Sequence, residues 1–144
     1  MNTTKTLMSP MLSILLAVAL TTPSGAATSA DLSQASKAVW DGHLQKAMSG
    51  NLDAVMADFA DDSAILTAGK TYAGKAAVRE FLGNAIRGFT PEAVKTIVMQ
   101  SEVPLGNVVY TKLTVGAAKR TFVYTAVIDG GKIMTITETD FPAE

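Results

Sequence analysis

The amino-acid sequence predicts an α+β fold, with helices first along the chain and antiparallel strands after them. In residues 31–59 and 74–89, apolar residues recur every three or four positions, which is the spacing of one helix face. From residue 94 onward the period changes to two, and short turn sequences separate the apolar runs. Because helices and strands are segregated rather than alternating, α+β is favoured over α/β.

The composition excludes several classes of protein. The 144 residues suggest one domain; 48% are hydrophobic and only 17% charged, so the chain can bury a core. A net charge of −1 without a basic cluster gives no footprint for nucleic acid. With no cysteine and one histidine, disulfides, thiolate zinc sites and sites with several histidine ligands are excluded. We expect no metal and no cofactor.

The N-terminus has the pattern of a secretory signal peptide over residues 1–27. Lys5 precedes an apolar segment that ends at Leu20, and small residues around a Pro/Gly break follow, up to Ala26 and Ala27. An anchor helix is the alternative, but a membrane span needs about 20 apolar residues and this segment is shorter. We therefore expect a periplasmic or secreted protein that is free of the membrane after cleavage, with one domain over residues 28–144.

Three helices are predicted. The first runs from Asp31, which can cap its start, to Ser49, just before Gly50. Its apolar stripe consists of Val39, Trp40, His43, Leu44 and Ala47. A shorter helix follows Gly50-Asn51, carries Leu52, Val55, Met56 and Phe59, and is stopped by Asp61-Asp62. The third runs from Gly74 to Phe89 and ends at Thr90-Pro91, because the residue before a proline disfavours helix.

The predicted strands are two short ones followed by four long ones. Their ranges are 63–67, 71–72, 94–102, 107–115, 120–128 and 132–141. Asp129-Gly130-Gly131 is typical of a tight hairpin, which needs residues with positive φ. Because the long strands follow one another through short turns, the sheet should be mainly antiparallel.

Several of these segments, in this order, resemble the NTF2-like superfamily, in particular its branch of SnoaL-like and ketosteroid-isomerase-like proteins. The segments are Ser49-Gly-Asn-Leu-Asp53, Asp58-Phe-Ala-Asp-Asp-Ser-Ala-Ile-Leu66, Tyr72 to Phe81, and the hairpin Val127 to Ile133. The resemblance implies an NTF2-like (cystatin-like) cone, in which a curved sheet wraps around a long N-terminal helix and encloses an apolar cavity. It also implies a homodimer formed through the outer face of the sheet, for which Val109, Thr111, Leu113 and Val123 are suitable residues.

The catalytic residues of the ketosteroid isomerases do not carry over to this chain. Those enzymes use an Asp base, with a Tyr and a protonated Asp as donors to the oxyanion. Aligned on Phe59 to Asp62, the base position is Thr67, the Tyr position is His43 and the protonated Asp position is Tyr124. Threonine cannot act as a carboxylate base, so the resemblance does not imply steroid isomerisation by that mechanism.

His43, Tyr124 and Glu138 are the candidate catalytic residues. A neutral imidazole can take a proton, and a phenol can donate a hydrogen bond to a developing oxyanion. His43 and Tyr124 have a structural alternative, as a buried histidine bonded to a backbone carbonyl and a packed aromatic ring. Glu138 and Asp140 share one strand face, which is either the cavity face or the solvent face. Trp40, Thr67, Phe81 and Ile136 are candidate ligand-binding residues.

Two functions follow as expectations. The first is an exported domain that binds a small apolar or aromatic molecule without chemistry. The second is a cofactor-independent isomerase, lyase or cyclase that works by proton transfer with His43 and Tyr124. Convergence of His43, Tyr124 and Glu138 on one point would favour the enzyme, and an isolated His43 would favour binding. A scaffold whose cavity is filled by its own side chains is a third alternative.

The predicted leader can be tested by intact mass. Protein recovered after export should lack about 26–27 N-terminal residues, because a signal peptidase cleaves after small residues at the end of the apolar segment. Recovery of the full-length chain fixed in a membrane would contradict this prediction.

Overall fold

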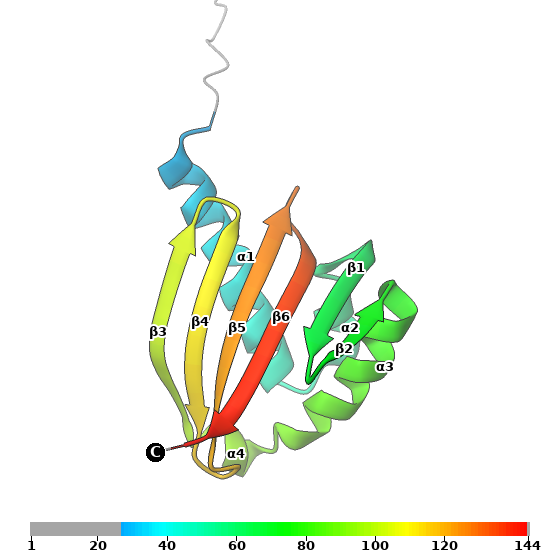
Figure 1. The fold of residues 1–144 in the computed structure, drawn as a ribbon, viewed down its shortest axis with the longest axis vertical. Helices are drawn as coiled ribbons and strands as arrows, with labels where there is room; N and C mark the ends of the chain where they lie inside the picture. Colours follow the sequence, from blue (N-terminus) through cyan, green and yellow to red (C-terminus); the bar gives the residue numbers. More distant parts are fainter. Residues whose placement is uncertain (1–26, 144) are drawn as a thin grey trace, which may run out of the picture.

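A computed structural model describes residues 27–143, which form a curved six-stranded sheet with helices packed on one face (Figure 1). The long helix α1 crosses behind β3 to β6, and α3 lies against β1 and β2. The helices are α1 (Ser29–Met48), α2 (Leu52–Met56), α3 (Lys75–Ala85), the 3₁₀ turn η1 (Ile86–Gly88) and α4 (Pro91–Val94). The strands are β1 (Phe59–Thr67), β2 (Lys70–Ala73), β3 (Ile97–Leu105), β4 (Val108–Val115), β5 (Arg120–Asp129) and β6 (Lys132–Pro142).

The sheet has the strand order β2-β1-β6-β5-β4-β3, and β1 with β6 is the one parallel pair among the described strands. The α+β class and the mainly antiparallel sheet are therefore confirmed. The strand register shifts within β3, between Met99 and Ser101, and in the pairing of β5 with β6, at Val127 and Ile128. Such irregularities increase local twist, which helps the sheet to curve around α1.

Helix α1 begins earlier than the sequence predicts. Thr28 is the N-cap, its side chain accepts from the Asp31 backbone N–H, and the Asp31 carboxylate accepts from the Thr28 backbone N–H. Asp31 is thus the third residue of a capping box rather than the cap itself. On the buried stripe, the Trp40 indole N–H donates to Oγ1 of Thr111 in β4 over 2.7 Å. This bond ties the middle of α1 to the middle of β4.

Two predicted boundaries change for reasons of packing. Phe59 belongs to β1 and not to the second helix, because the chain is already extended there and pairs with Ile133 of β6. Pro91 does not end the third helix; α3 stops at Ala85, and Pro91 is the first residue of α4, where its missing N–H costs nothing. The four-residue α4 adds to the three predicted helices and delays the start of β3 to Ile97.

The two faces of the sheet are unlike. Val109, Thr111 and Leu113 of β4 are buried beneath the helices, so the expectation that they lie on an outer, dimer-forming face is wrong for these three. Val123 pairs with Lys112 on the opposite face. A period of two shows that residues share a face, but the face that α1 covers depends on packing from elsewhere in the chain. No helix within residues 27–143 is long and apolar enough to cross a membrane.

Candidate functional site

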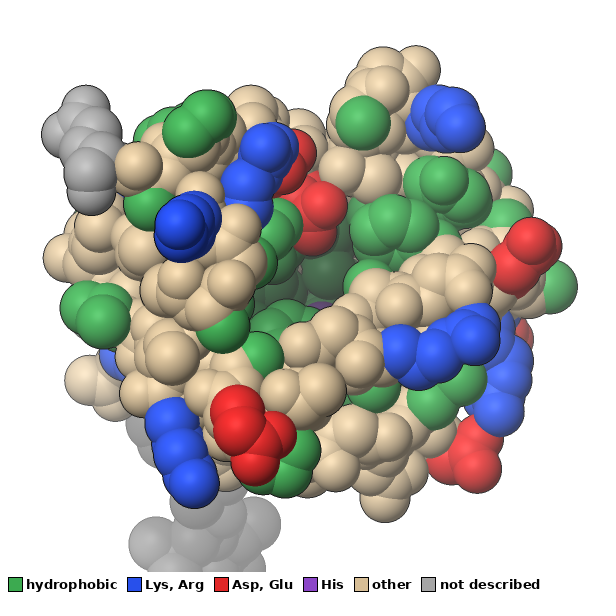
Figure 2. Space-filling view, turned by 90° about the horizontal axis from the view of Figure 1, so that it is seen from below, with side chains coloured by type: hydrophobic (Ala, Val, Ile, Leu, Met, Phe, Trp, Pro, Cys, Tyr) green, Lys and Arg blue, Asp and Glu red, His purple; other side chains and the backbone are tan. Residues whose placement is uncertain are grey.

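A cavity of about 260 Å³ lies between α1, α3 and the concave face of the sheet. It opens at the end of the molecule that is lowest in Figure 1, where η1 and the turn between β4 and β5 contribute Gly88, Phe89 and Ala118. Figure 2 looks into this opening: hydrophobic side chains line the hollow, acidic side chains lie at its edge, and the one histidine is visible at depth. The apolar wall includes Leu44, Ala47, Ile65, Leu82, Phe89 and Phe122.

Most of the residues predicted for the site do line this cavity. They are Trp40, His43, Phe81, Tyr124, Ile136 and Glu138. Thr67 is not among the residues that line it: it lies at the end of β1 beside Glu138 and borders a neighbouring groove with Lys70 and Thr139. The prediction that Thr67 binds a ligand stays a prediction: Thr67 is not a lining residue, but its hydroxyl donates to Oε1 of Glu138 over 2.9 Å. Thr67 acts on the cavity by holding Glu138.

His43 is buried at the inner part of the cavity between two aromatic rings. Trp40 stacks on it with a centroid distance of 5.3 Å, and Phe59 meets it edge-on at 5.2 Å. Its Nδ1 lies 3.5 Å from Oδ2 of Asp58, a residue that does not line the cavity. The sequence left open whether the partner of His43 is a backbone carbonyl or Glu138. In the structure, the group that faces Nδ1 of His43 is the carboxylate of Asp58.

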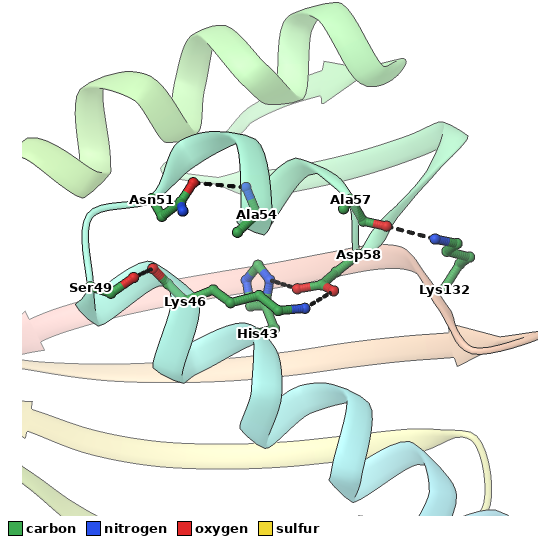
Figure 3. A network of polar contacts seen from close by, with 8 residues as sticks. All are labelled: His43, Lys46, Ser49, Asn51, Ala54, Ala57, Asp58 and Lys132. Carbon is green, nitrogen blue, oxygen red and sulfur yellow. Dashed lines mark hydrogen bonds and ion pairs between the residues drawn. The ribbon is translucent and has the colours of Figure 1, made fainter.

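Asp58 is the centre of a polar network beneath the cavity (Figure 3). Its carboxylate faces His43 and also pairs with Lys46 of α1, and its backbone carbonyl accepts from the Ile133 N–H over 2.8 Å. Lys132 donates to the neighbouring carbonyl of Ala57 over 2.6 Å. Burial works to raise the pKa of Asp58, but His43 and Lys46 work to lower it. The pKa of Asp58 therefore lies below the usual value for an aspartate. Asp58 is therefore an anchored carboxylate.

Tyr124 and Glu138 form a second polar pair. They are opposite one another on β5 and β6, and both side chains face the cavity. Burial, with a smaller contribution from Glu138, raises the pKa of the Tyr124 phenol, which keeps it a donor. Burial also raises the pKa of Glu138, helped by nearby Asp140 and opposed by hydrogen bonds from Thr67 and Tyr124. Glu138 thus holds its proton more readily than an exposed glutamate.

Asp140, two residues further along β6, follows Glu138 on the same face. It is partly exposed and pairs with Arg120 at the start of β5. The open question of which face these acids share is answered by Glu138, which lines the cavity. Asp140, near the C-terminal end of β6, and Arg120 form an ion pair that is partly exposed, so solvent weakens the attraction between the two charges.

His43 does not contact the pair of Tyr124 and Glu138 through any polar interaction among the described residues. Among the described residues, no hydrogen bond or ion pair joins His43 to Tyr124 or Glu138. Trp40 contacts both aromatic partners, with ring centroids 5.3 Å from His43 and 5.8 Å from Tyr124. The cavity therefore has an imidazole at one place, a phenol and carboxyl pair at another, and apolar surface over the rest. This arrangement suits the holding of an apolar molecule with polar groups on its periphery.

Sequence reasoning missed Asp58, the residue that orients His43. Asp58 lies fifteen positions after His43, beyond a helix and a turn, and no helical or strand spacing links the two. The cavity walls were easier to foresee, because Phe81, Leu82, Ile86 and Phe89 all belong to the apolar face predicted for the third helix. Within residues 27–143 there is no group of three acidic, histidine or cysteine side chains placed to hold a metal ion.

Comparison with known proteins places the fold. Neither the protein-family models nor the curated proteins include a match to this sequence. Among solved structures, an NTF-2 like protein of unknown function from Burkholderia xenovorans is 18% identical, over 77% of this chain and 84% of that one, with a TM-score of 0.56. A putative ketosteroid isomerase from Kribbella flavida is 14% identical, over 77% and 81%, with a TM-score of 0.62.

Two further structures show how widely this fold is used. The epoxide hydrolase/cyclase-like enzyme SalBIII, from pyran ring formation in salinomycin, is 20% identical over 75% of this chain and 92% of its own, with a TM-score of 0.62. A de novo designed protein with a curved β-sheet also has a TM-score of 0.62, at 18% identity over 76% and 87%. This chain therefore has the fold of the NTF2-like superfamily. At these identities the likeness concerns the fold alone, and function depends on the site.

The Asp58 network predicts a specific pH dependence of stability. At pH 7, Asp58→Asn should lower the free energy of unfolding by about 1–3 kcal/mol, because it removes a charged partner from His43 and Lys46. The folded-state pKa of Asp58 lies below its unfolded value, so its contribution is present above the unfolded pKa and is lost as pH falls through the folded pKa. Urea unfolding should show a smaller difference in the free energy of unfolding between the unmodified protein and Asp58→Asn at pH 3 than at pH 7.

The matched control is Asp53→Asn, which removes an exposed carboxylate paired with Arg79 on the surface of α2. It should change stability by less than about 1 kcal/mol. Equal stability of Asp58→Asn and the unmodified protein at pH 7 would show that the network does not stabilise the fold.

Proposed function

We propose that this protein is an exported binding domain that holds a small apolar or aromatic molecule in the cavity beneath α1. The observation that carries the proposal is the cavity itself: about 260 Å³, open at one end, with walls formed mainly by apolar side chains. Sites for small molecules have this character, with a few polar groups that set orientation. The volume is near the lower end for such sites, which favours a ligand of one or two rings.

Export is part of the proposal and is supported by the leader pattern of residues 1–27. Residues 1–26 of that segment lie outside the residues that the structure describes. The pattern of one positive charge, an apolar segment and small residues is that of a secretory signal. An exported carrier of small molecules would function in the periplasm or outside the cell.

Proton-transfer chemistry is the second candidate function. It is supported by a histidine that faces a carboxylate on one side and lines the cavity with the other, as a general base requires. An isomerase, lyase or cyclase using His43 and Tyr124 would act on a molecule that reaches both groups. Binding is preferred because His43 lies apart from the pair of Tyr124 and Glu138, so a ligand would have to span the cavity to connect them.

Ligand binding can be tested by closing the cavity. Ala47 is buried on the stripe of α1 and lines the cavity, so Ala47→Leu should occupy part of its volume. We expect this variant to bind naphthalene at least tenfold more weakly than the unmodified protein, measured by isothermal titration calorimetry. Ala38→Leu adds the same atoms on the exposed face of the same helix and should leave the affinity unchanged.

Native mass spectrometry of protein purified from its own host provides a second measurement. A retained small molecule that Ala47→Leu no longer carries would support the proposal. Undetectable naphthalene binding, together with a ligand-free mass, would contradict it and would favour a scaffold without a ligand.

We also propose that the convex face of the sheet binds a second copy of the chain. The described helices pack on the other face (Figure 1), and Val98, Val103, Leu105 and Phe141 are exposed. Lys112 is the one charged side chain among the residues of β3, β4 and β5 whose register places them on this face. In a two-fold interface the same patch meets itself, and a face almost free of charge avoids repulsion between like groups.

A charge placed on this face should separate the copies. Leu105 is 67% exposed, so Leu105→Glu should leave the circular dichroism spectrum unchanged while it converts a dimer into a monomer in light scattering at micromolar concentration. Leu32→Glu, at an exposed position of α1, is the control and should remain dimeric. A monomeric mass for the unmodified protein would overturn the proposal.

A further inference from the structure

We propose that the ligand of the cavity carries an O–H or N–H donor that bonds to Nε2 of His43, and that Asp58 sets this preference by facing Nδ1. The inference rests on the proposed binding function and names the class of ligand: an aromatic or alicyclic alcohol, or a ring with an N–H. Asp58 is a positioning residue in this proposal, since it does not line the cavity and acts through His43.

The position of Asp58 determines which imidazole nitrogen of His43 carries the proton. Asp58 is anchored by Lys46 through its side chain and by the Ile133 N–H through its backbone, so the carboxylate is held in place. A carboxylate only accepts hydrogen bonds, and its Oδ2 lies 3.5 Å from Nδ1. In the neutral ring, the proton is then stabilised on Nδ1, and Nε2 carries the free lone pair.

The two ring nitrogens point in different directions, and Nδ1 faces Asp58, outside the cavity lining. Nδ1 is fully buried whereas Nε2 is not among such atoms, and His43 lines the cavity, so we infer that Nε2 is the nitrogen presented to it. Trp40 stacked on one side and Phe59 edge-on keep the ring from turning.

Nε2 has no hydrogen-bond donor among the described residues and, unlike Nδ1, is not among the fully buried atoms without a partner; the cavity walls near it are apolar. An acceptor that is open to the cavity can take a hydrogen bond from a ligand, and a ligand that supplies a donor gains that interaction on binding. A ligand with only acceptors at this end gains nothing. The site therefore selects for a donor.

The experiment compares three ligands of one ring system: 2-naphthol, 2-methylnaphthalene and 2-methoxynaphthalene. The methyl compound matches the hydroxyl in size, and the methoxy compound keeps the oxygen without the donor. Calorimetry at pH 7.5 with the unmodified protein should show 2-naphthol binding about tenfold more tightly than either. Equal affinities, or a preference for the methoxy compound, would overturn the inference while leaving the proposed function intact. Absence of binding by all three would overturn both.

Variants separate His43 from the other polar group of the cavity. His43→Phe should abolish the preference for 2-naphthol, and Asp58→Asn should reduce it, because an amide both donates and accepts and no longer fixes the tautomer. Asp53→Asn, on the exposed surface of α2, should keep the full preference. Glu138→Gln should also keep it. If the preference for 2-naphthol survives in His43→Phe but disappears in Glu138→Gln, the hydroxyl of the ligand bonds to Glu138 and not to His43. That result would contradict the proposal.

Discussion

The cavity depends on how α1 is held against the sheet. Trp40 is almost completely buried, and its indole N–H donates to Thr111 on strand β4. The ring also stacks on His43 and contacts Tyr124, so one side chain sets the separation of helix and sheet and forms part of the cavity wall. Loss of this hydrogen bond would leave a buried threonine hydroxyl without its donor, which costs more than the bond itself contributes. The position of every residue on the inner stripe of α1 follows from this anchor.

Around the anchor, polar groups divide into two sets with opposite electrostatic character. Beneath the cavity, His43 and Lys46 lower the pKa of Asp58 and keep it charged. On the sheet, burial raises the pKa of Glu138 and favours its neutral form. One carboxyl group thus lies as a fixed acceptor behind the histidine, and the other faces the cavity and holds its proton more readily than an exposed glutamate. Environment alone distinguishes their roles.

The same fold is found in proteins described as an isomerase, as a cyclase-like enzyme and as a design. What these structures share with this chain is the fold. In this chain, the curved sheet, α1 and α3 enclose the cavity. The chemistry of the hollow then depends on the few polar side chains that point into it.

The sequence by itself determined the α+β class, the order of helices and strands, and the apolar stripe that brings Trp40 and His43 to the cavity, because these features depend on local periodicity. The turn at Asp129 to Gly131 also follows from local chemistry, since its two glycines have positive φ. Only the tertiary structure decided which side of the sheet is covered, and it placed Val109, Thr111 and Leu113 inside, beneath the helices. Alternation along a strand is symmetric between the two faces, so only the docking of α1 distinguishes them. The pairing of His43 with Asp58 was likewise decided by tertiary structure, because the turn after α2 returns the chain to α1 at a separation that no repeating pattern encodes.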